Sequence, residues 1–371
     1  MDPIRVLYIN GGIMDRGGVS AYMMNYYRHI DRSKVQIDFV VHGFEKGVFD
    51  DEIQELGGLL YNVPVKSKNY FGNIRALRKI FRSGQYKIVH SHMDAMGAVV
   101  LKEARKCGIP IRIAHSHNTD HLTNNKIKYL LNEIARKRIN EYSTHLFACS
   151  ELAGKWLFGE KAFNAGDVRV IKNAIEVETY KYDKDISNRM KKELSLENNY
   201  IIGNIGRFDY QKNHIFLLDV FKHVIKLIPN AKLVLVGDGH LRKKIEAKIE
   251  ELGLSNSVLL LGQCSNINEI LCVFDVFVLP SLFEGLGIAA VEAQVNGLRC
   301  CLSDTLPKEV VVTDKIEFLS TNNINDWVNA LVNIRSTDRT IYTKDFFDAG
   351  YDIIYAAKKL CDIYIDMVKG V

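Results

Sequence analysis

The chain has 371 residues, which is more than one hydrophobic core usually fills, so two domains are expected. Hydrophobic residues make up 47% and charged residues 25%, with only 6 prolines, which excludes disordered, collagen-like and stalk proteins. The longest apolar runs, such as 273–280, are too short to span a membrane, and no signal peptide is visible at the start. We therefore expect a cytoplasmic protein, or one that lies on the inner leaflet of the cell membrane without crossing it.

The seven cysteines include no CxxC pair and no Cys/His cluster at zinc spacing, which predicts buried free thiols and no structural metal. The net charge of +5 is unevenly divided: basic residues exceed acidic ones over 1–172, and acidic residues exceed basic ones over 173–371. This asymmetry favours an anionic partner for the N-terminal half, such as a membrane surface, a lipid phosphate or nucleic acid. Ordinary solvated helix faces would explain it equally well.

Short β-branched runs alternate with longer amphipathic segments along the whole chain. In the first half we expect strands at 4–9, 35–41, 87–91, 111–115 and 144–149, and helices near 19–30, 71–83, 95–107 and 126–142. In the second half we expect strands at 200–204, 232–236, 258–261, 276–279 and 299–302, and helices near 214–228, 240–252, 266–272 and 287–296. This alternation predicts an α/β protein with parallel sheets covered by helices on both faces.

The expected architecture is two Rossmann-like, doubly wound parallel-sheet domains that face each other across a cleft. Residues 1–175 would form the first domain and 200–345 the second, with the polar stretch 176–199 as the linker and start of the second domain. The last helix, in 346–371, is expected to pack back toward the N-terminal domain. Ligands of such sheets bind beyond the carboxyl ends of the strands, so residues that follow each strand are the candidates for a site.

Two loops after strands have the composition of phosphate sites. In the first, Gly17 and Gly18 directly precede a helix, so backbone amides can approach an anion, although a simple tight turn is the alternative. Neither a dinucleotide fingerprint nor a P-loop fits this segment. In the second, Arg207 and Lys212 lie between a strand end and a helix start, where each can neutralise one phosphate of a diphosphate.

A third segment, 280–293, combines carboxylates with glycines. Glu284 follows a buried strand, and Glu292 is the only charged residue on an otherwise apolar helix. A lone carboxylate there needs a partner, either ligand hydroxyls or an Arg or Lys. The alternative is that Glu284 caps the helix and Glu292 forms a salt bridge.

Two histidine pairs with i, i+2 spacing end strands of the first half: His90 with His92, and His115 with His117. Neutral histidines that hydrogen-bond a ligand are favoured over core histidines, and a metal site completed by Asp94 or Asp120 is the weakest reading.

These segments together resemble the retaining GT-B glycosyltransferases of family 4. Residues 280–293 resemble that family's E-x7-E segment, and 206–213 resemble its G-R-x3-Q-K-[GN] motif. Residues 236–239 and 261–263 match its usual strand ends, and 170–175 resemble its I-P-N-G-[VI] junction, with Lys172 and Ala174 in place of Pro and Gly. The order agrees across nearly the whole chain, and the sequence is most similar to bacterial capsular or exopolysaccharide transferases.

The resemblance implies a metal-independent transferase without a cofactor. It would transfer a sugar from a nucleotide-diphosphate sugar to a glycan or polyprenyl-diphosphate acceptor, with retention of configuration. A UDP-sugar is the favoured donor. The first domain would bind the acceptor and the second the donor. The only D-x-D, Asp183-Lys-Asp185, lies in the polar linker and is a poor metal site.

The resemblance also implies a role for each site residue. Arg207 and Lys212 would bind the diphosphate and stabilise its growing charge. Glu284 would contact sugar hydroxyls, Glu292 the ribose, and His117 would contribute to catalysis near the sugar. The remaining donor contacts would come from backbone groups of Gly17, Gly18, Cys264, Gly285, Leu286 and Gly287.

Retention could arise from a double displacement through Glu284, or from same-face attack in which the leaving phosphate helps deprotonate the acceptor, and we favour the latter. The rival activities are a GT-B nucleotide-sugar epimerase and a non-catalytic sugar-nucleotide-binding subunit. Nucleic acid is not expected as a partner because no recognition motif is present. Basic residues gather near 66–82 and 126–138, which predicts attachment to an anionic membrane surface.

Overall fold

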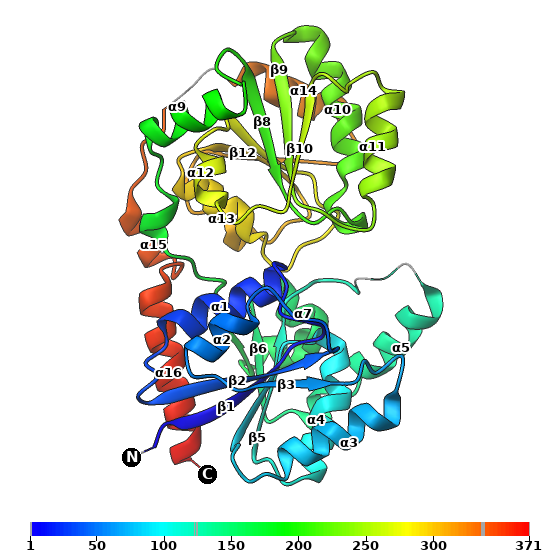
Figure 1. Ribbon diagram of the computed structural model, residues 1–371, viewed down its shortest axis with the longest axis vertical. Coiled ribbons are helices and arrows are strands. Elements are labelled where there is room, and N and C mark those ends of the chain that lie inside the picture. The colour runs from blue at the N-terminus through cyan, green and yellow to red at the C-terminus, as the bar shows by residue number, and fades with distance from the viewer. Residues whose placement is uncertain (1, 122, 124, 335–337, 371) are drawn as a thin grey trace. The chain divides into compact units, whose positions relative to one another are not determined.

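The computed structural model describes residues 2–121, 123, 125–334 and 338–370, and these divide into two compact units (Figure 1). The first unit comprises residues 1–175 together with 350–371, and the second comprises 176–349. The prediction of two Rossmann-like parallel-sheet units is confirmed. No helix of the described ranges is both long and apolar enough to cross a membrane.

The N-terminal unit is built on a seven-stranded parallel sheet of order β3-β2-β1-β4-β5-β6-β7. Its strands are β1 (Ile4–Ile9), β2 (Val35–His42), β3 (Leu60–Val63), β4 (Ile88–Ser91), β5 (Ile111–Ser116), β6 (His145–Ala148) and β7 (Val168–Val170). Its helices are α1 (Gly18–His29), α2 (Asp50–Glu55), α3 (Tyr70–Phe81), α4 (Gly97–Lys106), α5 (Lys126–Arg136), α6 (Ile139–Tyr142), α7 (Glu151–Phe158), α8 (Glu160–Asn164) and α16 (Ile353–Lys369).

The C-terminal unit has a six-stranded parallel sheet of order β10-β9-β8-β11-β12-β13. Its strands are β8 (Tyr200–Ile205), β9 (Ala231–Val236), β10 (Val258–Gly262), β11 (Val276–Leu279), β12 (Arg299–Ser303) and β13 (Ile316–Leu319). Its helices are α9 (Lys184–Glu193), α10 (His214–Leu227), α11 (Arg242–Glu251), α12 (Ile267–Leu271), α13 (Ile288–Val295), α14 (Ile324–Asn333) and α15 (Thr343–Asp348). Every strand expected from the sequence is present, with ends that differ by a residue or so.

The structure differs from the sequence-based expectation at two helical segments. The helix expected over 126–142 is divided into α5 and α6. Helix α5 buries none of its residues, whereas α6 buries Ile139 and Tyr142, so the chain changes direction between them to bring these two side chains into the core. The polar stretch 176–199 contains α9, which Asp183 caps by accepting hydrogen bonds from the backbone N–H groups of Asp185 and Ile186. This stretch is therefore part of the second unit, and its D-x-D is used for helix capping.

The last helix belongs to the first unit. Helix α16, red in Figure 1, lies against α1 and contributes Leu360 and Tyr364 to the core around β1 and β2. The Tyr364 hydroxyl lies 2.8 Å from that of Tyr8 and 2.7 Å from His90 Nδ1, deep inside the unit. The chain thus returns from the second unit to complete the first.

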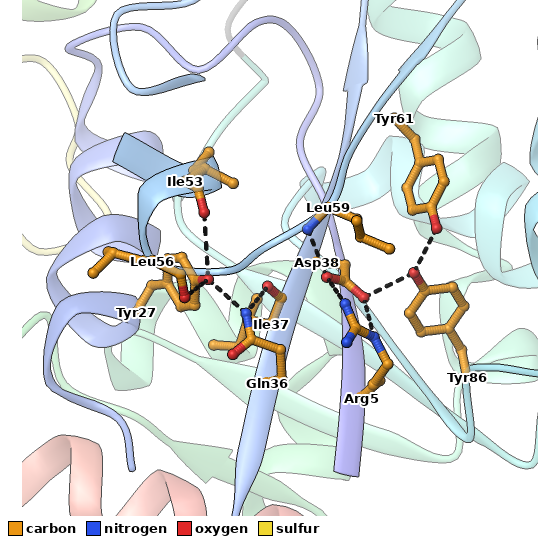
Figure 2. Close-up of polar contacts among 10 residues, drawn as sticks. All are labelled: Arg5, Tyr27, Gln36, Ile37, Asp38, Ile53, Leu56, Leu59, Tyr61 and Tyr86. Atoms are coloured by element: carbon orange, nitrogen blue, oxygen red, sulfur yellow. Dashed lines mark hydrogen bonds and ion pairs between the residues drawn. The ribbon is translucent and has the colours of Figure 1, made fainter. Parts of the chain in front are cut away.

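A polar network buried beside β1 and β2 shows how charge is accommodated inside the first unit (Figure 2). The fully buried Asp38 receives two hydrogen bonds from Arg5, at 2.8 and 2.5 Å, and one from the Tyr86 hydroxyl at 2.8 Å. Its carboxylate also accepts the backbone N–H of Leu59, which precedes β3. Because every carboxylate oxygen is hydrogen-bonded, the desolvation cost of the buried ion pair is offset and β1, β2 and β3 are tied together.

None of the seven cysteines, all in the described residues, forms a disulfide; five of them are buried, whereas Cys107 and Cys264 are half-buried. This agrees with the expectation of free thiols that pack as small apolar side chains.

Candidate functional site

In the N-terminal unit, the glycine loop after β1 ends in an open helix N-terminus. Asp15 Oδ1 accepts the Gly17 N–H at 2.9 Å, and α1 then begins at Gly18 without a side-chain cap. A Cβ on Gly17 would lie 2.8 Å from Asp15 Oδ1, so a larger residue here would displace the Asp15 side chain. Nothing would crowd a Cβ on Gly18, which leaves its backbone open to a ligand. The loop has the uncapped amides that favour an anion.

The four histidines at the ends of β4 and β5 form one cluster, in which the rings of each segment stack and hydrogen bonds join the two segments. His90 Nε2 lies 3.0 Å from His115 Nδ1, and His92 Nδ1 lies 2.9 Å from His117 Nε2. The ring centroids of His90 and His92 are 4.2 Å apart, as are those of His115 and His117. Each i, i+2 pair therefore shares one side of its segment, as the spacing predicts.

All four rings are neutral at pH 7. Burial holds the pKa of His90, His92 and His115 well below the ordinary value and lowers the pKa of His117 to about 3. Neighbouring imidazoles add to the effect of burial for the first three, because a second charge in the stack would be repelled.

A metal site is the alternative function for this cluster, because ligand atoms of His90, His92 and His115 lie within 4.8 Å of one another. However, the rings stack and hydrogen-bond to each other, so their lone pairs do not converge on one point. Asp94 is engaged elsewhere: its two oxygens accept the His117 N–H at 2.6 Å and the Asn118 side-chain amide at 2.9 Å. The other candidate, Asp120, accepts the backbone N–H of His121.

In the C-terminal unit, the residues after β8 and β11 meet, because these strands are neighbours in the sheet. Lys212 Nζ lies 2.5 Å from Glu284 Oε1, and both side chains are largely buried, with 16% and 7% exposure. Ser281 Oγ donates to the same carboxylate at 2.7 Å, and Gln211 Nε2 lies 3.3 Å from it. The sequence placed Lys212 and Glu284 in one site but did not predict that they form an ion pair.

Arg207 lies on the more open side of this site. Its side chain is 52% exposed, and its Nε donates to Asp209 Oδ2 at 2.7 Å. Because the bond to Asp209 engages Nε, the terminal nitrogens of the guanidinium are available to an anion.

The glycines after Glu284 form the start of α13. Gly287 caps this helix with a φ of 87°, a left-handed conformation that glycine adopts without strain, and a Cβ there would lie 3.1 Å from Leu306 Cδ2. Leu286 as a whole is buried, with 1% exposure. All three residues, Gly285, Leu286 and Gly287, are buried, and contact of their amides with a donor stays a prediction.

Glu292 is nearly enclosed by protein, although its side chain keeps some contact with solvent. Burial raises its pKa to about 7, and a hydrogen bond with Tyr180 opposes that shift. It does not form a salt bridge with any described residue, contrary to the alternative considered from the sequence. Tyr180 was not identified from the sequence, because it lies in the stretch interpreted as a linker.

Cys264 follows β10, which is separated from β8 by β9 in the sheet. Its half-buried thiol lies 3.7 Å from the Leu261 carbonyl oxygen and 3.8 Å from that of Gly262. The candidate residues thus form two groups: Gly17, Gly18 and His117 in the first unit, and Arg207, Lys212, Cys264, Glu284–Gly287 and Glu292 in the second.

Both units carry groups beyond their strand ends that suit a phosphorylated ligand: an open helix N-terminus in the first, and Lys212 with Arg207 in the second. Residues 16–179 match the family model for glycosyltransferase family 4, and residues 185–339 match that for glycosyl transferases group 1. The chain belongs to glycosyltransferase family 4 and is a glycosyltransferase.

Known relatives agree with this assignment. A putative glycosyltransferase of Bacillus subtilis, EpsF, is 37% identical over 310 residues, which cover 82% of this chain and 80% of EpsF. The Escherichia coli UDP-Gal:alpha-D-GlcNAc-diphosphoundecaprenol alpha-1,3-galactosyltransferase is 29% identical over 309 residues, 79% of each chain. The crystal structure of Anabaena HepE in complex with UDP and glucose matches with a TM-score of 0.77 and 18% identity, over 97% of this chain and 99% of HepE, and shares the GT-B fold.

Proposed function

We propose that this glycosyltransferase transfers a sugar from a UDP-sugar to a glycan or polyprenyl-diphosphate acceptor, with retention, in the assembly of a capsular or other cell-surface polysaccharide. The Lys212–Glu284 ion pair beside Arg207 carries this proposal. Two cations beyond the carboxyl end of one parallel strand, β8, suit a diphosphate. The UDP donor and diphosphoundecaprenol acceptor in the name of the E. coli relative support the same chemistry.

The proposed roles follow from what each group can donate or accept. Lys212 exchanges Glu284 for a donor phosphate, and Arg207 binds the other phosphate. Glu284 then accepts hydrogen bonds from hydroxyls of the transferred sugar, while Glu292 accepts one from the ribose. The backbone at Gly17, Gly18, Cys264, Gly285, Leu286 and Gly287 supplies further donor contacts, and His117 contributes to catalysis.

We favour a same-face mechanism for retention. The bond between the anomeric carbon and the β-phosphate oxygen breaks, the acceptor oxygen forms a bond on the same face, and the acceptor proton passes to the departing phosphate. Arg207 and Lys212 stabilise the negative charge that develops on the diphosphate. Glu284 is already held by Lys212, Ser281 and Gln211, which suits a positioning carboxylate better than a nucleophile.

Glu284→Gln separates the two mechanisms. The amide keeps the shape of the carboxylate and one acceptor oxygen but cannot form a glycosyl ester. Under same-face attack we expect residual transfer with retained configuration, measured by NMR of the product anomer. Complete loss of transfer in a variant that still binds donor would support the double displacement.

A panel of UDP- and GDP-sugars tests the activity itself. Purified protein is incubated with each donor, with and without an undecaprenyl-diphosphate-linked sugar, and nucleotide release and donor anomers are followed. We expect release of UDP that increases with acceptor and falls about 100-fold or more in Lys212→Met. Conversion of the donor to its epimer would identify an epimerase, and binding without turnover would identify a non-catalytic subunit.

We also propose that the two cations replace a metal at the diphosphate. Activity should then survive EDTA and gain nothing from added Mg²⁺ or Mn²⁺. Loss of turnover in EDTA that Mn²⁺ restores would contradict this proposal.

Helix α5 supports the proposed attachment to an anionic membrane. Its large apolar residues lie at i, i+3, i+4 and i+7 and are all exposed: Ile127 72%, Leu130 61%, Leu131 56% and Ile134 51%. Its polar side faces the protein instead, where Glu133 bonds His121 and Arg136 bonds the Trp156 carbonyl oxygen. The helix, drawn in teal at the periphery of its unit in Figure 1, is therefore amphipathic with the apolar face outward.

The charges around this face match an anionic bilayer. Lys126, Lys128, Lys137 and Arg138 are exposed on and beside α5. Basic residues that flank an apolar stripe let a helix lie in the membrane interface, where each adds about 1 kcal/mol of attraction to anionic lipid.

Vesicle sedimentation tests this attachment. We expect binding to vesicles that contain phosphatidylglycerol, weaker binding to purely zwitterionic vesicles, and release as salt rises. The double variant Leu130→Ser/Leu131→Ser should lose binding, whereas Leu227→Ser, which changes an exposed leucine of the second unit, should not. Binding that is insensitive to both salt and the α5 substitutions would contradict the proposal.

A further inference from the structure

We infer that His92 is a positioning residue that fixes the tautomer of His117, so that His117 presents an Nδ1–H donor to its ligand. The inference deepens the proposed function, because it says what His117 offers to a substrate, and it rests on that function only for its kinetic consequence. His92 itself is buried and is not expected to touch substrate.

The hydrogen bond between the two rings allows only two arrangements. His92 Nδ1 lies 2.9 Å from His117 Nε2, and both rings are buried among other neutral imidazoles. A neutral imidazole carries one N–H and one lone pair, so a single proton lies between these two nitrogens. Either His92 donates from Nδ1, or His117 donates from Nε2.

The far nitrogen of His92 distinguishes the two arrangements. His92 Nε2 is fully buried and has no hydrogen-bond partner among the described residues. If His117 donated, the His92 proton would have to sit on this nitrogen as a buried, unpaired N–H. If His92 donates, the same nitrogen holds only an unused lone pair. Unpaired buried N–H groups are rarer than unsatisfied acceptors, so donation by His92 is favoured.

The consequence appears at the other side of His117. With Nε2 accepting from His92, the His117 proton must reside on Nδ1. His117 Nδ1 has no hydrogen-bond partner among the described residues. It is also not one of the buried polar atoms that lack a partner, so solvent can reach it. Asp94 fixes the backbone of the same residue through the His117 N–H. His117 is therefore arranged to donate to a ligand oxygen, such as a sugar hydroxyl or a phosphate, and not to act as a base at Nδ1.

Nitrogen NMR measures the tautomer directly and requires no substrate. In ¹⁵N-labelled protein, long-range ¹H–¹⁵N spectra distinguish protonated from unprotonated ring nitrogens, and His117→Asn assigns the signals of His117. We expect a protonated Nδ1 and an unprotonated Nε2 in the wild-type protein. A protonated Nε2 on His117 would overturn the inference.

Two polar substitutions at His92 provide a matched pair. His92→Asn keeps an amide donor near the position of Nδ1, whereas His92→Gln moves the same amide toward the position of Nε2. We expect the Asn variant to keep the His117 tautomer and the Gln variant to lose it, with His223→Gln, an exposed histidine, as the control. Identical His117 spectra in the Asn and Gln variants would overturn the inference.

The catalytic efficiency of the same two variants tests the consequence for the reaction. Loss of a partner that fixes a histidine tautomer costs about 10- to 100-fold in activity at metal sites. We expect a similar fall of kcat/KM for His92→Gln and a change of a few-fold for His92→Asn. Equal losses in both would indicate a purely structural role and contradict the inference. If no donor is turned over but the NMR result holds, the proposed function fails and the tautomer assignment stands.

Discussion

Lys212 and Glu284 neutralise each other in a site where both side chains are largely removed from water. A cation held in this way is available to an incoming diphosphate without a new charge having to be buried first. When Lys212 turns to a phosphate in the proposed complex, Ser281 and Gln211 still donate to the carboxylate. Without ligand, the same ion pair stabilises the second unit.

Lys212→Met should lower the free energy of unfolding of the second unit by about 1–3 kcal/mol, because it leaves a poorly solvated carboxylate without its cation. The same substitution in a Glu284→Gln background should cost clearly less. Urea unfolding can be followed by fluorescence of Trp327, which is buried in the second unit, after Trp156 of the first unit is replaced by Phe. Additive costs in the double-mutant cycle would show that the two residues are not coupled.

Glu292 gives a pH-dependent prediction. Its pKa is about 7 in the folded protein, above the ordinary glutamate value of 4.5, so the folded state holds the proton more tightly than the unfolded state does. The contribution of Glu292 to stability is therefore full below about pH 4.5 and is lost as the pH rises toward 7. Relative to wild type, Glu292→Gln should become progressively more stable between pH 5 and pH 7.5, by up to about 3 kcal/mol. A difference in unfolding free energy that does not vary with pH would contradict the raised pKa.

At the residue scale, the sequence shows which side chains belong to the candidate site better than it shows which residues they contact. The family motifs named Arg207, Lys212, Glu284 and Glu292, but the contacts of these residues depend on which strands are neighbours. Glu292 meets Tyr180 because residues more than a hundred positions apart come together in the fold. Only the spacing within one strand, as in His90–Ser–His92, could be converted into geometry before the structure was known.

At the element scale, the long central strands were predictable because they are nearly continuous apolar runs between helical patterns. The strands β3, β7 and β13 were not expected, since each is at an edge of its sheet, spans only 3 to 4 residues and is partly exposed. Helix α5 was expected as part of a longer helix. Its periodicity was correct, but periodicity alone does not reveal that its apolar face points outward.

Helix α16 gives the prediction that belongs to this scale. Leu360 is fully buried in the core around β1 and β2, so Leu360→Ala should destabilise the first unit by about 2–5 kcal/mol. Lys359→Ala, the neighbouring exposed position, is the control. Hydrogen exchange should accelerate in residues 4–9 of the first unit and remain unchanged in residues 200–205 of the second. Equal acceleration in both segments would show that α16 does not stabilise the first unit specifically.

At the scale of the whole molecule, the second unit is an insertion in the first. The chain leaves the first unit after Ile175 and re-enters it at Gly350. The two crossing segments are tied together within the first unit, where the Ile175 N–H donates to the Tyr351 carbonyl oxygen and the Ile353 N–H donates to that of Ile175. Each unit keeps its own core and its own group of candidate residues, so ligand effects on the two can be separated.

The two tryptophans allow that separation, because Trp156 lies in the first unit and Trp327 in the second. UDP should bind the Arg207–Lys212 group and stabilise the second unit by about 2.7 kcal/mol at 100 times its Kd. In a Trp156→Phe protein, the Trp327 transition should therefore move to higher temperature with UDP, and much less with Arg207→Ala added. Arg207 is half exposed, so its replacement should leave the unliganded transition nearly unchanged. If UDP instead shifted only the Trp156 transition, which is seen in the wild-type protein and is lost in Trp156→Phe, the nucleotide would bind the first unit. The proposed division of roles between the units would then be wrong.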